Sequence, residues 1–280
     1  YTDILPSFHA KYAIHSNGNL RFSYARAINR PSFFEIVPYS IINEDYKEKG
    51  NPELKHTVAD NIDLRYEFFP RSSEQLMVGL FYKNIKDPIE YGLLNEGQDT
   101  YYKPMNFGTA NNWGLEVDIL KYFNWLGIKA NYTYTYSKIT TEKRVMQGSE
   151  VTTTTQSRPL FGQAAHVANI SFLLKDSKHG WEGQLAMGYT GKRLSDISNW
   201  ADNDIWEKGY TQLDASIEKT LPRGFCLFLK ASNLLNIPVL RYVHQSERTA
   251  NVDSERDNSN LVERKSWHGQ SLMIGARFRL

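Results

Sequence analysis

Residues that could catalyse a reaction or bind a metal are scattered along this chain of 280 residues. Seven histidines stand in different segments: His9, His15, His56, His166, His179, His244 and His268. Cys226 is the only cysteine, which excludes a thiolate metal cluster and a disulfide framework within the chain. The sequence contains no H-E-x-x-H, G-x-S-x-G, Walker or Rossmann pattern. We therefore predict no catalytic site, no metal site and no cofactor.

Aromatic side chains in long polar segments form a second group with chemical potential. These segments contain Tyr46 and seven residues that we take as candidate ligand contacts: Tyr39, Tyr91, Tyr101, Tyr102, Trp200, Trp206 and Arg241. Aromatic faces near an arginine suit stacking on sugars or catecholate-like rings. The same side chains would also suit packing of one loop on another, or an aromatic girdle at a membrane interface.

Charge and composition exclude two large classes of protein. The 33 Lys and Arg residues against 31 Asp and Glu residues leave a net charge of +2, which provides no basic field for nucleic acid. No uninterrupted apolar run reaches about 18 residues, which excludes a helical membrane protein. The 17 Tyr, 14 Phe and 6 Trp residues favour half-exposed strands instead.

The hydropathy pattern has a period of two along most of the chain. Between Ile62 and Phe68 every second residue is apolar, and between Ile128 and Ser137 the alternation runs without a fault. A strand places successive side chains on opposite faces, so each segment has one apolar and one polar face. Carboxylates on the polar face, such as Asp63 and Glu116, alternate with basic residues and are expected to line a water-filled interior.

The alternation predicts about eleven strands, most of them long enough for a tilted crossing of a bilayer. The segments are Phe8–Ile14, Leu20–Tyr24, Ile62–Phe68, Leu76–Tyr82, Trp113–Ile119, Ile128–Tyr136, Ala168–Leu174, Trp181–Tyr189, Leu213–Ile217, Phe225–Ala231 and Leu272–Leu280.

Connections between these segments alternate strictly in length. Short ones rich in Gly, Pro, Asn and Ser stand at 15–19, 70–74, 121–125, 176–180 and 221–224. Long polar ones cover about 28–56, 84–111, 138–164, 190–209 and 233–266. An outer-membrane barrel separates its connections in this way, because its periplasmic turns are short and its extracellular loops are long.

An odd number of strands does not close an antiparallel barrel. An open sheet in hydrocarbon would leave two edges without hydrogen-bonding partners. Either the count of strands is wrong by one, or further strands precede Tyr1; we favour the second interpretation.

The C-terminal strand resembles the signal by which outer-membrane barrels are assembled. Gly275, Phe278 and the terminal Leu280 carry this partial match. It implies the barrel assembly machinery as a partner, although an ordinary last strand would also fit.

Several short motifs together resemble TonB-dependent outer-membrane receptors. They are Arg30-Pro31, the stretch 50–54 (GNPEL), 81–89 (FYKNIKDPI), 106–110 (NFGTA) followed by 114–117 (GLEV), and 231–236 (ASNLLN). They span the whole chain in the order and spacing of that family. The resemblance implies an all-β fold, a transmembrane antiparallel β-barrel with about 11 strands here out of about 22. Residues 1–280 would then form the C-terminal part of the barrel, with the plug domain absent from this chain.

The resemblance also implies function, location and partners. The whole protein would be a receptor in the outer membrane of a Gram-negative bacterium, taking up a scarce nutrient such as a siderophore. It would not be an enzyme. Its partners would be the lipid bilayer, the plug domain and N-terminal barrel half, the TonB complex and a possible surface lipoprotein, with no nucleic acid.

Three alternatives remain open at this point. A complete small barrel would be a passive porin or an outer-membrane hydrolase, and a surface adhesin would bury the apolar faces in a protein core. Haem receptors resemble the interval from Arg30 to Pro52 but carry a histidine within it, whereas the nearest histidine here is His56. Haem is therefore disfavoured.

Overall fold

The computed structural model describes residues 2–43, 46–96, 99–244 and 260–278. Within these ranges the chain forms two β-sheets, a single helical turn α1 (Phe33–Ile36) and a 3₁₀ turn at Pro222–Gly224. None of the helical segments in the described ranges is long and apolar enough to cross a membrane.

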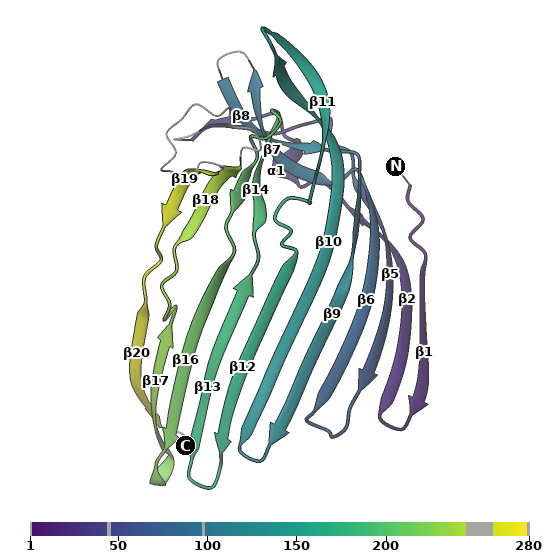
Figure 1. Ribbon diagram of the computed structural model, residues 1–280. Coiled ribbons are helices and arrows are strands. Elements are labelled where there is room, and N and C mark those ends of the chain that lie inside the picture. The colour runs from purple at the N-terminus through teal and green to yellow at the C-terminus, as the bar shows by residue number, and fades with distance from the viewer. Residues whose placement is uncertain (1, 44–45, 97–98, 245–259, 279–280) are drawn as a thin grey trace.

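The larger sheet follows the chain through eleven consecutively paired antiparallel strands (Figure 1). They are β1 (Ser7–His15), β2 (Gly18–Asn29), β5 (Thr57–Phe68), β6 (Gln75–Lys86), β9 (Thr109–Phe123), β10 (Leu126–Gln147), β12 (His166–Asp176), β13 (Trp181–Thr190), β16 (Tyr210–Thr220), β17 (Phe225–Ser232) and β20 (Ser271–Phe278). Each contains one of the eleven predicted segments, except that Arg279 and Leu280 lie outside the described residues. The sheet is strongly curved and open, with β1 and β20 at its edges.

Alternation along the strands gives the large sheet an apolar and a polar face. Ile62, Leu64 and Leu80 lie in register on one face, where 40%, 41% and 54% of their surfaces are exposed. On the other face, polar side chains bind across neighbouring strands: Arg21 Nε lies 2.7 Å from Glu67 Oε2, and Gln75 Nε2 lies 2.5 Å from Asp118 Oδ1. The predicted lining of carboxylates and basic residues is thus a cross-strand network.

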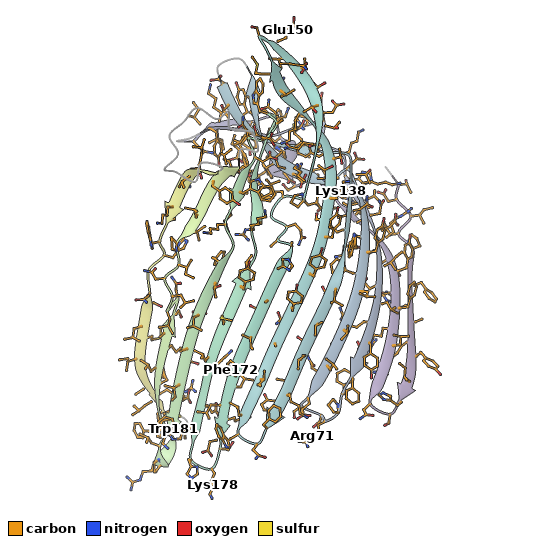
Figure 2. The ribbon with its side chains drawn as sticks, in the orientation of Figure 1. Arg71, Lys138, Glu150, Phe172, Lys178 and Trp181 are labelled. Atoms are coloured by element: carbon orange, nitrogen blue, oxygen red, sulfur yellow. The ribbon has the colours of Figure 1, made fainter. Side chains whose placement is uncertain are left out.

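The short and long connections lie at opposite ends of this sheet. Arg71 and Lys178 mark the end with short turns, whereas Lys138 lies where β10 rises out of the sheet (Figure 2). β10 continues into a hairpin with β11 (Glu150–Arg158), whose tip carries Glu150.

The other four long connections form a second sheet, which we call the loop sheet. Its strands are β3 (Ser40–Ile42), β4 (Lys47–Lys49), β7 (Ile89–Glu96), β8 (Asp99–Asn106), β14 (Arg193–Ser198), β15 (Ile205–Glu207), β18 (Val239–His244) and β19 (Asn260–Ser266). Their order, β19-β18-β15-β14-β7-β8-β4-β3, joins segments from different connections. These strands were not predicted from the sequence, where the same regions read as polar loops.

Of the five largest fully buried side chains in the described residues, Cys226 lies on β17 and the other four lie where the loops meet the large sheet. At most about 2% of the surface is exposed for these four residues, which are Ile139 on β10, Leu194 and Ile197 on β14, and Pro104 on β8. The compact apolar core therefore belongs to the loop assembly, while the apolar face of the large sheet remains open.

Candidate functional site

Three tyrosine rings pack against one another at the loop sheet, and we call them the tyrosine stack after its stacked pair, Tyr91 and Tyr102. The Tyr102 ring on β8 lies 5.0 Å from that of Tyr91 on β7 at an interplanar angle of 21°. The Tyr46 ring lies 5.0 Å from that of Tyr102, tilted by 41°. Burial raises the pKa of Tyr91 and that of Tyr102, so both hydroxyls are neutral at physiological pH. The stack is a neutral aromatic surface built from two connections that are separate in sequence.

Tyr101 faces away from this stack, because adjacent residues on a strand point to opposite sides. Its ring lies beneath Lys49, whose Nζ is 3.3 Å from the ring centroid, and its hydroxyl donates to Asp99 Oδ2 at 3.0 Å. Lys47 Nζ lies 2.7 Å from the same carboxylate. The hydrogen bond from Lys47 lowers the pKa of Asp99, and the reciprocal bond raises that of Lys47. This side of β8 carries a cation–π and ion-pair cluster.

Tyr39 lies close to the stack and is held by a carboxylate. Its hydroxyl donates a hydrogen bond of 2.8 Å to Glu48 Oε1 on β4. Burial, followed by this hydrogen bond, raises the pKa of Tyr39 to about 12. The Glu48 charge also contributes to the raised pKa of Tyr91. Tyr39 and the tyrosine stack therefore share one electrostatic environment.

A partly buried ion pair lies near the tyrosine stack. Arg241 on β18 pairs with Asp196 on β14, and its Nε lies 3.2 Å from Glu263 Oε2 on β19. Burial raises the pKa of Asp196, and the Arg241 charge opposes that effect. The Asp196 charge is in turn a cause of the raised pKa of Tyr102. The arginine and the tyrosines thus lie in a common region of the loop sheet.

The two candidate tryptophans lie apart from the stacked rings. Trp206 on β15 pairs in register with Leu194 and Tyr242, and Lys192 Nζ lies 5.5 Å from its ring centroid. Trp200 forms a β-bridge with Arg144 of the β10–β11 hairpin. The structure therefore brings Tyr91 and Tyr102 together with Tyr39 and Arg241, and it places the tryptophans at junctions between connections.

Two buried ion pairs that the sequence did not reveal fasten the β10–β11 hairpin to the loop sheet. Arg158 Nη2 lies 2.9 Å from Glu90 Oε2 on β7, with 2% and 5% of the two side chains exposed. Lys143 Nζ lies 2.5 Å from Asp204 Oδ1, with 1% and 6% exposed. Charged residues in polar segments look alike in sequence whether they are solvated or buried, so no local signal distinguished these four.

The histidines and the cysteine occupy separate places. His56 contacts Asp3, His166 contacts Tyr132, and His179 contacts Asp176, on different strands or turns. Cys226 is fully buried with its sulfur 3.6 Å from Thr220 Oγ1. In the described ranges, no three His, Cys, Asp or Glu residues converge in an arrangement that would hold a metal ion.

Comparison with known families accounts for this architecture. A family model described as TonB dependent receptor-like, beta-barrel, matches residues 1–234. The chain belongs to this family. No curated protein matches the chain in sequence.

Solved structures of siderophore receptors share the fold of this TonB-dependent receptor chain at low sequence identity. A siderophore receptor, PiuA, from Acinetobacter baumannii is 15% identical with a TM-score of 0.65, over 97% of this chain and 35% of its own. PirA from the same species is 16% identical with a TM-score of 0.58, over 84% and 37%. A variant of the ferric enterobactin receptor from Pseudomonas aeruginosa is 16% identical with a TM-score of 0.57, over 84% and 35%. The chain thus spans well under half the length of these receptors.

In the barrel of a TonB-dependent receptor, the face that carries Ile62, Leu64 and Leu80 is the one in contact with lipid. The C-terminal strand takes part in this wall. The Phe278 ring lies 4.9 Å from that of Phe225, and Gly275 stands opposite Phe228 in register. Leu280, the last residue of the predicted assembly signal, lies outside the described residues.

Proposed function

We propose that residues 1–280 form the C-terminal part of a receptor barrel that takes up a scarce ligand across the outer membrane of a Gram-negative bacterium. The match to the receptor family over residues 1–234 supports this function. The open eleven-stranded sheet supports the domain assignment, because the remaining wall must come from further strands. A plug domain and an N-terminal half of the barrel are the partners that this arrangement requires.

The ligand that we propose is a ferric siderophore with aromatic, catecholate-like groups. The observation that carries this proposal is the stack of Tyr46, Tyr91 and Tyr102 beside the Arg241–Asp196 pair. Flat neutral rings offer stacking surfaces, and the Arg241 guanidinium, which Asp196 and Glu263 hold in place, offers N–H donors to the oxygens of a chelate. The similar receptors of known structure are named for siderophores or for ferric enterobactin. Tyr39, Tyr101, Trp200 and Trp206 are the further proposed contacts.

Uptake would be energised through TonB, acting on the plug from the inner membrane. A possible surface lipoprotein would act from outside, and the barrel assembly machinery would insert the protein. Chemical bonds of the ligand would remain unchanged, because binding and gated passage need no catalytic group. The proposed function is therefore transport rather than catalysis.

The test is uptake of radioactive iron complexed to a catecholate siderophore, in iron-starved cells that express the whole receptor. We expect uptake that stops when the proton gradient is collapsed. Tyr102→Ala should weaken binding about tenfold or more, since an aromatic stacking contact is worth about 0.5–1.5 kcal/mol beyond the area it buries. Tyr12→Ala, at an exposed ring on the lipid face of β1, is the matched control. Uptake that persists without the gradient would indicate a passive porin instead.

A further inference from the structure

A pocket opens on the lipid-facing side of the large sheet, at its loop end, and we call it the rim pocket. Its apolar walls are Pro31, Ile36, Pro52, Leu54 and Val58. Its charged or titratable lining residues are Arg30, Lys55, His56, Lys86 and Asp87. The pocket has a volume of about 670 Å³. None of these residues belongs to the tyrosine stack or to its neighbouring ion pair.

The register of the strands places the rim pocket on the lipid side. Lys86 on β6 is paired with Val58 on β5, and four residues further along the same strands Ile62 is paired with Tyr82. Because faces alternate with a period of two, all four residues belong to one face of the sheet. That face is the apolar one described above.

An aromatic band lies on the same face between the pocket and the apolar middle of the sheet. Tyr82 on β6 is paired with Trp113 on β9, and the Trp113 ring stacks 5.3 Å from that of Tyr136 on β10. Rings of Tyr and Trp gather where the hydrocarbon of a membrane meets its head groups. The rim pocket therefore lies at head-group level, just beyond this band.

The pocket carries an excess of positive charge. Lys55 and Lys86 are exposed, and Asp87 is the single carboxylate among the lining residues. His56 contacts Asp3, and Arg26 on the same face is neutralised by Asp60 at 2.8 Å. The side chains of Lys55 and Lys86 form no ion pair with another described residue. Asp60 is near enough for the Lys86 charge to act on it, but neither ammonium is held in an ion pair among the described residues, so both can contact a ligand from outside the chain.

We propose that the rim pocket binds a phosphate-bearing lipid of the surrounding leaflet. Its Lys55 and Lys86 ammonium groups contact the phosphate, and its apolar walls contact the upper part of the acyl chains. Basic residues beside a membrane attract anionic head groups, and long lysine side chains reach them from the edge of the hydrocarbon. An apolar wall next to a cationic rim matches an amphiphile better than it matches a free anion.

The experiment is native mass spectrometry of the whole receptor, purified in a neutral detergent and titrated with phosphatidic acid or with diacylglycerol of the same chains. These two probes differ only in the phosphate. We expect phosphatidic acid to stay bound to the receptor in the mass spectrometer and diacylglycerol to dissociate from it. Each lysine should contribute about fivefold in affinity, so Lys55→Gln with Lys86→Gln should weaken binding about 25-fold.

Matched controls separate the rim pocket from general charge. Lys11→Gln with Lys129→Gln removes two exposed lysines from the polar face and should leave binding within about twofold. Leu54→Asn should weaken the binding of phosphatidic acid and leave the affinity for inorganic phosphate unchanged. Heat-modifiable migration in electrophoresis verifies that each variant has folded.

Three results would overturn the proposal. Equal retention of diacylglycerol would show that the phosphate is irrelevant. Equal losses in the rim and control variants would show an effect of net charge alone. Binding of inorganic phosphate as tight as that of phosphatidic acid would identify a site for a soluble anion rather than a lipid.

Discussion

Lys143 Nζ lies 2.5 Å from Asp204 Oδ1, in a site where both side chains are almost completely buried. Lys143 also donates to the Ser198 carbonyl, and Asp204 accepts a 2.7 Å hydrogen bond from the Ser198 backbone N–H. The lysine belongs to the β10–β11 hairpin and the aspartate to the next long connection. Burial lowers the pKa of Lys143, while the Asp204 charge opposes this effect. The pair is thus an internal clamp between two loops.

Removing either partner of this clamp should destabilise the loops strongly. Lys143→Met leaves Asp204 as an uncompensated buried charge, and such changes cost about 3–5 kcal/mol. Hydrogen exchange of the peptide that covers residues 198–206 should therefore accelerate in Lys143→Met and in Asp204→Leu. The double variant should recover most of the protection, because no buried charge remains. Lys138→Met, at an exposed position of the same strand, should leave the exchange rate of this peptide unchanged.

The second buried pair tests geometry rather than charge alone. Arg158 contacts both carboxylate oxygens of Glu90, and its guanidinium lies 5.1 Å from the centre of the Phe107 ring. Lysine keeps the charge but loses the planar fork, so Arg158→Lys should lower the stability of the loop assembly by about 1–2 kcal/mol. Arg158→Met leaves Glu90 as an unpaired buried charge and should lower that stability by about 3–5 kcal/mol. Limited proteolysis within the β10–β11 hairpin measures both. Equal cleavage of the lysine variant and the native protein would show that the bidentate contact contributes nothing.

The Tyr39–Glu48 contact should respond to alkaline pH. The folded pKa of Tyr39, about 12, lies above the ordinary value of 10.0. A raised pKa means that the contribution of this contact to stability is present below pH 10 and is lost as the pH rises through about 12. The difference in absorbance at 295 nm between the native protein and Tyr39→Phe should show one ionisation in that range. An ionisation near pH 10 in this difference would contradict the hydrogen bond as described.

Gly275 should be sensitive to any side chain. A Cβ added there would lie 2.8 Å from Phe228 Cε1 on the neighbouring strand, too close for an undisturbed ring. Gly275→Ala should therefore cost about 1–3 kcal/mol through overpacking. The fraction of barrel that folds, measured by heat-modifiable migration, should fall. Adding Phe228→Leu should restore it, and failure of this rescue would point to a role of Gly275 other than space.

Sequence alone determined the large sheet of this protein. The alternation from Ile62 to Phe68 and from Ile128 to Ser137 is a local property, because each strand shows its two faces in its own residues. The strict order of short and long connections then placed neighbouring strands side by side. The eleven predicted segments each lie in one strand of the large sheet for this reason, apart from the last two residues, which lie outside the described ranges.

Only the tertiary structure decided what the long connections do. β14 pairs with β7 across more than a hundred residues of chain, and this pairing exists because the large sheet brings those connections to one edge. The sequence also offered both Tyr101 and Tyr102 as ligand contacts, whereas strand β8 turns their rings to opposite sides. Lys143 and Asp204 stand in segments that read as solvated, since burial of a charge depends on a distant partner rather than on its neighbours in the chain.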